Sequence, residues 1–136
     1  MGAVRPGCVR KWGKMSAHQM VCHLADSFRG VMGEKALAPM PGLFGRRIIK
    51  WLALDVPLPW AHGLKTMPEM DQEIGGTRPV EFASDVRDLE RLFERFTNEP
   101  RDFSWKPHPI FLEMSDAEWM KWGYRHMDHH FKQFGV

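Results

Sequence analysis

The sequence predicts an all-α protein: a bundle of helices that run up and down, in a single domain over residues 1–136. In four segments, apolar residues recur at steps of three and four, which is typical of helices with one buried face. Two of these segments begin with a capping box, and Pro and Gly gather between the segments. With 43% apolar and 26% charged residues, the composition is that of an ordinary globular protein with one core.

The first helix is expected to run from about Ser16 to Met32 and to stop at Gly33. Residues 1–14 hold three glycines and one proline, so we expect an irregular leader. Gln19 follows Ser16 at the spacing of a capping box, in which each side chain bonds the other's backbone N–H. The apolar face of this helix comprises Met20, Val21, Leu24, Phe28 and Val31.

A shorter helix is expected over residues 43–54, after a break rich in Pro and Gly. Its stretch Arg46–Trp51 resembles an interfacial membrane anchor, but a buried helix with a charged outer edge is the favoured interpretation. Residues 55–80 then hold four prolines and three glycines, which exclude a long regular element. Ordered loops of this length usually act as lids or binding loops.

The third helix, over about residues 82–96, shows the clearest amphipathic pattern of the chain. Its expected apolar face carries Phe82, Val86, Leu89, Phe93 and Phe96. Its expected polar face carries Asp85, Arg87, Asp88, Arg91, Glu94 and Arg95. The last helix begins with a capping box from Ser115 to Glu118, runs to about Phe134 and ends at Gly135.

Composition and charge argue against several classes of function. The formal net charge is +2 and there is no long basic run, so nucleic acid is not an expected partner. No apolar run approaches the roughly 18 residues of a membrane span, and the N-terminus lacks the apolar core of a signal peptide. Cys8 and Cys22 are too few for a disulfide framework, so we expect a protein of the reducing cytoplasm.

Three histidines lie close together in the last helix: His126, His129 and His130. Since a helix turns by about 100° per residue, His126 and His130 stack on its apolar side, whereas His129 lies at the border. Two stacked imidazoles can share one metal ion, as they do in helical zinc sites. The alternative is a pair of core histidines with hydrogen-bond partners, and spacing alone leaves the two interpretations balanced. A metal site would need a third ligand.

His23 is the best candidate for that ligand, although a helical wheel places it at the flank of the first helix's apolar face. Spacing alone would favour a surface position for it. Asp26, three residues on, is either a hydrogen-bond partner that orients the His23 ring or a plain solvated charge. Weaker candidates lie on other faces of the helix or in loops: His18, Cys22, His62 and His108.

Two stretches together resemble the DinB/YfiT-like family of metal-dependent proteins, closest to a branch of unknown function. Trp12–Asp26 is similar to the family's Trp-containing region that ends in His-Leu-x-Asp. His126–Gln133 is similar to its closing His-x-x-x-His helix. The resemblance covers residues 12–135, is weak through the long loop, and implies a four-helix bundle.

The resemblance also implies that His23, His126 and His130 bind a divalent metal. Zn²⁺ is favoured, with Ni, Fe and Mn as alternatives, and three imidazoles leave the open coordination position of catalytic zinc. The implied function is a metal-dependent transferase or hydrolase acting on a small molecule by thiol transfer, isomerisation or hydrolysis. A low-molecular-weight thiol or water would be activated by the metal. Apart from the resemblance, Asp71 or Glu73 in the long loop is a candidate acid or base if that loop folds over the metal.

Two alternatives stay open: a non-catalytic, stress-related bundle that binds a metal or ligand, and a helical assembly protein whose histidines bind nothing. The sequence also departs from the family, because only the irregular leader precedes Trp12 where members carry a full helix. Residues 43–54 are one candidate to fill the gap, and a truncated start is another interpretation. An uncovered apolar face would favour self-association, so a homodimer is expected.

Overall fold

The computed structural model describes residues 2–40 and 44–136, and within them the chain is helical. The elements are α1 (Ala17–Met32), α2 (Arg46–Leu54), the 3₁₀ helix η1 (Pro68–Met70), α3 (Phe82–Thr97) and α4 (Asp116–Phe134). The predicted all-α class is therefore confirmed. The start of the second predicted helix, residue 43, lies outside the described residues.

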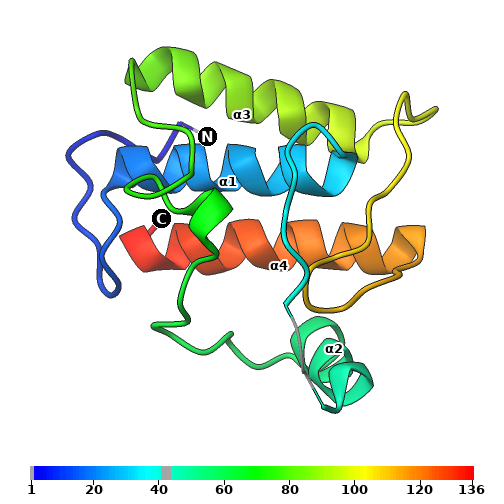
Figure 1. The fold of residues 1–136 in the computed structure, drawn as a ribbon. Helices are drawn as coiled ribbons and strands as arrows, with labels where there is room; N and C mark the ends of the chain where they lie inside the picture. The colour runs from blue at the N-terminus through cyan, green and yellow to red at the C-terminus, as the bar shows by residue number, and fades with distance from the viewer. Residues whose placement is uncertain (1, 41–43) are drawn as a thin grey trace.

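Helix α1 lies between α3 and α4 and contacts both (Figure 1). Helices α1 and α3 run in the same direction, and α4 runs the opposite way. Helix α2 packs against α4 at the edge of this layer, while η1 packs on α1. The bundle therefore consists of three long helices, with one short helix at the side.

The helix ends follow the chemistry expected from the sequence. The Ser16 hydroxyl accepts from the backbone N–H of Gln19 at 3.1 Å, and the Gln19 side chain accepts from the Ser16 N–H at 2.8 Å. Ser115 and Glu118 form the same reciprocal pair at the start of α4. A side-chain cap of this kind typically contributes about 1 kcal/mol. Both predicted capping boxes are confirmed.

The core forms around α1, which is buried along most of its length. Phe28, at its centre, is fully buried and meets Phe93, Phe96 and Trp122 at ring-centroid distances of 5.6, 4.9 and 5.8 Å. Aromatic packing of this kind joins all three long helices, because Phe28 belongs to α1, its two phenylalanine partners to α3 and Trp122 to α4. Trp122 in turn lies 5.0 Å from the His126 ring, so this packing adjoins His126.

The predicted apolar face of α3 packs on the core: Leu89 and Phe96 are buried, and Phe82, Val86 and Phe93 are partly buried against it. The prediction missed Leu92, which is also buried. Asp85, assigned to the outer face, instead points toward α1 and bonds His18. The reason is that α3 packs on α1 along one side only, and a groove of about 930 Å³ with mostly apolar walls separates it from α4 on another.

The expectation that α2 is a buried helix with a charged outer edge is wrong. Ile48 and Trp51 are 63% and 56% exposed. Two of the three basic side chains face the body of the protein: Lys50 pairs with Glu118 at 2.7 Å, and Arg46 donates to the carbonyl oxygen of Ile110 at 3.4 Å. Part of the apolar surface of α2 therefore faces outward, while Leu54 is buried in the core. Among the described residues, no helix is long and apolar enough to cross a membrane.

Candidate metal centre

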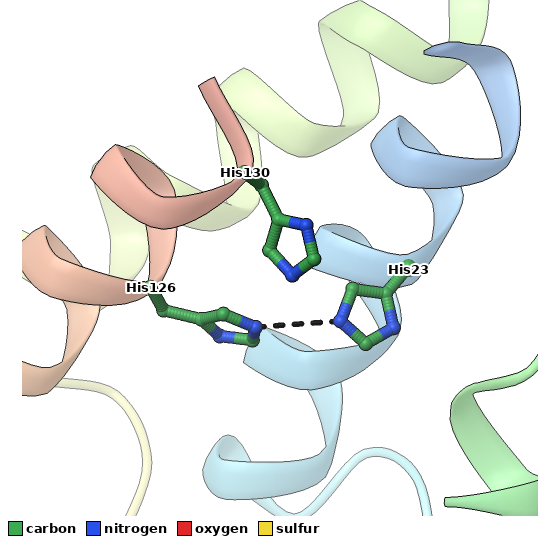
Figure 2. Close-up of side chains that lie close together, drawn as sticks. All are labelled: His23, His126 and His130. Atoms are coloured by element: carbon green, nitrogen blue, oxygen red, sulfur yellow. Dashed lines mark hydrogen bonds between the residues drawn. The ribbon is translucent and has the colours of Figure 1, made fainter. Parts of the chain in front are cut away.

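The three predicted histidines meet between α1 and α4 (Figure 2). His23 comes from α1, and His126 and His130 come from successive turns of α4. The Nε2 atoms of His23 and His126 are 3.3 Å apart, and one ring nitrogen from each histidine lies within 4.8 Å of the others. The three residues are 5%, 9% and 6% exposed, so their polar rings share one buried space.

The helical wheel placed the α4 histidines correctly and His23 incorrectly. His126 and His130 are buried, and His129 is only partly buried, as a border position requires. A surface position for His23 was favoured by spacing, but its flank of α1 is covered by η1. A helical wheel describes one helix alone, so it cannot predict that another segment, here η1, covers one flank of α1.

A backbone carbonyl determines how His23 presents its ring. Its Nδ1 lies 3.1 Å from the carbonyl oxygen of Met70, at the end of η1. A carbonyl oxygen only accepts hydrogen bonds, so Nδ1 must carry the proton in this contact. The Nε2 lone pair of His23 is then left to point into the space shared with the α4 histidines.

A second backbone carbonyl orients His130 through Gln133. The Gln133 Nε2 donates to the carbonyl oxygen of Trp12 at 2.9 Å, which fixes the orientation of the amide. Its Oε1 therefore faces the His130 Nδ1 at 2.9 Å and accepts a hydrogen bond from the Nδ1–H. His130, like His23, keeps its Nε2 lone pair for the shared space. The leader that carries Trp12 is thus part of the site.

His126 completes the cluster and makes the proton count unfavourable without a cation. Its Nδ1 is buried and has no hydrogen-bond partner among the described residues. If the His126 Nε2 carries the ring proton, this single N–H faces the Nε2 lone pairs of both His23 and His130. If the His126 Nδ1 carries the proton, the Nε2 lone pairs of all three rings face one another. Protonation is not a remedy, because burial and the neighbouring imidazoles hold the pKa of His126 well below 6.5. Burial likewise lowers the pKa values of His23 and His130.

Asp26 has neither of the roles considered for it. It is fully buried, and its carboxylate accepts from the Thr77 backbone N–H at 2.7 Å and pairs with Lys35 at 2.9 Å. Burial alone would raise the pKa of Asp26, but these partners bring it below the usual value. Asp26 therefore holds the loop after η1 on α1, and the Met70 carbonyl, not this carboxylate, bonds the His23 ring.

The two loop carboxylates proposed as acid or base bond elsewhere. Asp71 accepts from the Glu73 backbone N–H at 3.0 Å, and Glu73 accepts from the Gln19 side chain at 3.4 Å. No hydrogen bond joins either carboxylate to the three rings within the part of the chain that the structure describes. Against the larger effect of burial, which lowers the pKa of His23, the charge of Asp71 nevertheless raises it, and the acid or base role stays a prediction.

Aromatic rings from the leader and the long loop border the cluster. Trp12 stacks on His62 at 3.9 Å between ring centroids, and Trp60 lies 5.8 Å from both His126 and His129. The Trp60 Nε1 donates to the Ala53 carbonyl oxygen at 2.8 Å, which fixes its ring. We call these four residues (Trp12, Trp60, His62 and His129) the ring wall. Of these four rings, Trp60 lies beside His126.

His108 is a core histidine rather than a member of the cluster. Its Nδ1 accepts from the backbone N–H groups of Ile110 and Phe111 at 3.1 and 3.2 Å, and its ring stacks on Phe111. Burial lowers the pKa of His108 to about 3. His108 therefore fits the alternative interpretation of a core histidine with hydrogen-bond partners. That interpretation does not account for the three clustered histidines.

The sequence left two partners of the cluster unidentified. Gln133 stands three residues after His130, a spacing that places both on one side of a helix, so the contact was readable in principle. The contact of His23 with the Met70 carbonyl could not be predicted, because a backbone group carries no sequence signal and Met70 lies 47 positions after His23.

Comparison with family models matched the one described as "Protein of unknown function (DUF1569)" to residues 3–135. Comparisons with curated proteins and with solved structures found no match.

His108 makes stability depend on pH. Its folded-state pKa lies below the unfolded value, so the unfolded chain takes up the proton first and stability falls as pH drops below about 6.5. In His108→Asn, the Asn side-chain oxygen can accept from the Ile110 and Phe111 N–H groups, and Asn takes up no proton when the chain unfolds. We expect this substitution to reduce the slope of unfolding free energy against pH by up to about 1.4 kcal/mol per pH unit.

Urea unfolding at several pH values from 7.5 to about 4.5, with a chelator present, measures that slope. The exposed His62, changed to Asn, controls for the loss of one imidazole. Equal slopes in the wild type and His108→Asn would show that His108 does not resist protonation.

Proposed function

This chain belongs to the DUF1569 family, and we propose that it is a metal-dependent enzyme whose ion is bound by His23, His126 and His130. Zn²⁺ is the favoured ion, with Ni, Fe and Mn as alternatives. The proposed reaction is thiol transfer, isomerisation or hydrolysis of a small-molecule substrate. The resemblance to DinB/YfiT-like proteins points the same way and is itself part of the proposal.

The main support for the proposal is that the three rings bring more nitrogen lone pairs than N–H groups into one buried space. With their Nδ1 atoms held by Met70 and Gln133, His23 and His130 both direct Nε2 lone pairs into one buried space. A cation would satisfy these lone pairs and that of His126 at once. Around a tetrahedral zinc ion with bonds of about 2.0–2.1 Å, ligand nitrogens lie about 3.4 Å apart. The 3.3 Å between the Nε2 atoms of His23 and His126 fits that arrangement.

Such a metal, when bound, supplies Lewis-acid chemistry: it lowers the pKa of a bound water or thiol, or polarises a carbonyl. The protein's own residues do the rest. Met70 and Gln133 orient the rings from behind, an arrangement that raises the basicity of histidine ligands. The Trp12 and Trp60 rings of the ring wall offer apolar surface for the organic part of a substrate.

Charge supports an anionic ligand at the open position. Three neutral imidazoles do not compensate the charge of a divalent cation. The buried carboxylate on α1, Asp26, is engaged with Lys35 and Thr77. A thiolate from a low-molecular-weight thiol, or hydroxide formed from a bound water, would supply the missing negative charge, so charge is compatible with both thiol transfer and hydrolysis.

The homodimer remains a prediction, supported by apolar surface in two places. One is the groove between α3 and α4, and the other is the outward face of α2 with Ile48 and Trp51. Exposed apolar patches of this kind often mark sites of association.

Metal content tests the site. Protein purified without an affinity tag should lose one equivalent of metal when His126 and His130 are both changed to Ala, because a single remaining ring cannot hold the ion. His129→Ala, which removes a neighbouring imidazole on the same helix, should keep it. Elemental analysis gives the stoichiometry, and circular dichroism checks that each variant is folded. A double variant with wild-type metal content would refute the assignment.

Gln133 tests whether the tautomer of His130 matters. Gln133→Ala removes the acceptor that holds the Nδ1 proton, and loss of such an outer partner typically weakens metal affinity about 10–100-fold. Lys132→Ala is the matched control, since Lys132 lies on the same turn and pairs with Asp128. Competition with a chromophoric chelator measures both affinities. Unchanged affinity in Gln133→Ala would mean that the amide does not support the site.

Turnover separates an enzyme from the alternative, a non-catalytic metal- or ligand-binding protein. The zinc-loaded chain should catalyse attack of a low-molecular-weight thiol on an electrophilic small molecule, and His126→Ala should abolish the rate enhancement. Lys132→Ala again serves as control. A panel of thiols and electrophiles followed by thiol consumption measures the rate. Stoichiometric metal without turnover across the panel would favour the non-catalytic protein.

A further inference from the structure

A second cluster of metal-type side chains lies on the other side of α1. His18 and Cys22, one helical turn apart on α1, face Asp85 of α3. The His18 Nε2 is 2.6 Å from the Asp85 Oδ2, and the Cys22 Sγ donates to the same oxygen at 3.7 Å. One ligand atom from each of the three lies within 4.8 Å of the others. We propose that this cluster is a second, independent binding site for a divalent transition metal.

The two sites are separated by helix geometry. Cys22 and His23 are neighbours in sequence, so their side chains leave α1 about 100° apart. Cys22 is directed to Asp85 on α3, whereas His23 is directed to His126 on α4. Each site therefore joins α1 to a different helix, and neither needs a ligand from the other.

The donor set determines the class of ion. One imidazole, one thiol and one carboxylate match the ligands of zinc and related ions, whereas Mg²⁺ and Ca²⁺ prefer oxygen alone. The side chains of His18 and Asp85 are both 22% exposed, so an ion can enter from the solvent side with water as a fourth ligand. Cys22, on the inner side, is buried.

The distances require one small adjustment. Ligand atoms around tetrahedral zinc lie roughly 3.3–3.8 Å apart, which the Cys22–Asp85 distance already meets. The His18–Asp85 contact is a hydrogen bond and must open. The contacts from His18, Cys22 and the Val80 N–H all end on the same oxygen, Oδ2, whose distance to the Cys22 Sγ already fits.

A nucleophilic role fits Cys22 less well. Burial, followed by the charge of Asp85, raises the pKa of the Cys22 thiol to about 12, so the free thiol is protonated at neutral pH. Metal binding releases that proton to the buffer as the sulfur–metal bond forms. The bound ion would join α1 to α3 and stabilise the folded chain, since the unfolded chain does not hold the three ligands together.

Cobalt(II) titration of the metal-free chain tests the proposal. A cobalt ion bound by thiolate shows a charge-transfer absorption in the near ultraviolet, and a cobalt ion bound only by histidines does not. In the wild type, where the three-histidine site also takes up cobalt, we expect this band to stop growing by two equivalents of added cobalt. It should persist in the His126→Ala, His130→Ala double variant, so its outcome is independent of the three-histidine site.

The cobalt–thiolate band can be assigned to Cys22 without substituting Cys22, which is buried. The chain has two cysteines, so a band that persists in Cys8→Ser must come from Cys22. His18→Ala and Asp85→Asn should each weaken cobalt affinity at least about 10-fold. Absence of the band in the folded wild type, its loss in Cys8→Ser, or unchanged affinity in both ligand variants would overturn the proposal.

Discussion

His23 and His130 are buried, and the Nδ1–H of each donates to an oxygen acceptor. The Nε2 lone pairs of both rings therefore face one shared space. The Met70 carbonyl acts on His23, and the Trp12 carbonyl acts on His130 through Gln133. His126 adds a third ring with one proton to offer. Lone pairs that meet in a low-dielectric interior are costly unless something positive lies between them. The proposed function depends on this one electrostatic requirement.

The rest of the fold can be understood as support for that requirement. Phe28 packs the three long helices into a layer and so fixes the distance between α1 and α4. Asp26 holds the loop after η1 on α1 through Thr77, which keeps the Met70 carbonyl in place. Segments that look irregular in the sequence, the leader and the long loop, thus provide the groups that orient the rings.

Local signals in the sequence predicted the local features of the structure. Ser16 and Ser115 were readable as helix caps because a capping box lies within four residues, and the inward position of His126 and His130 follows from their spacing. Features that depend on packing between distant segments were not readable. The burial of His23 under η1, the fully buried Asp26 and the turn of Asp85 toward α1 each depend on a partner far along the chain.

Helix α1 has a double role in this account, with His23 on one side and His18 and Cys22 on another. The central claim, however, concerns the three histidines alone, and crystals of the zinc-loaded protein would test it most directly. Anomalous diffraction measured on both sides of the zinc edge should show a peak about 2.0–2.1 Å from one nitrogen of each of the three rings. A well-ordered cluster without such a peak, or with the three rings turned apart, would contradict the account.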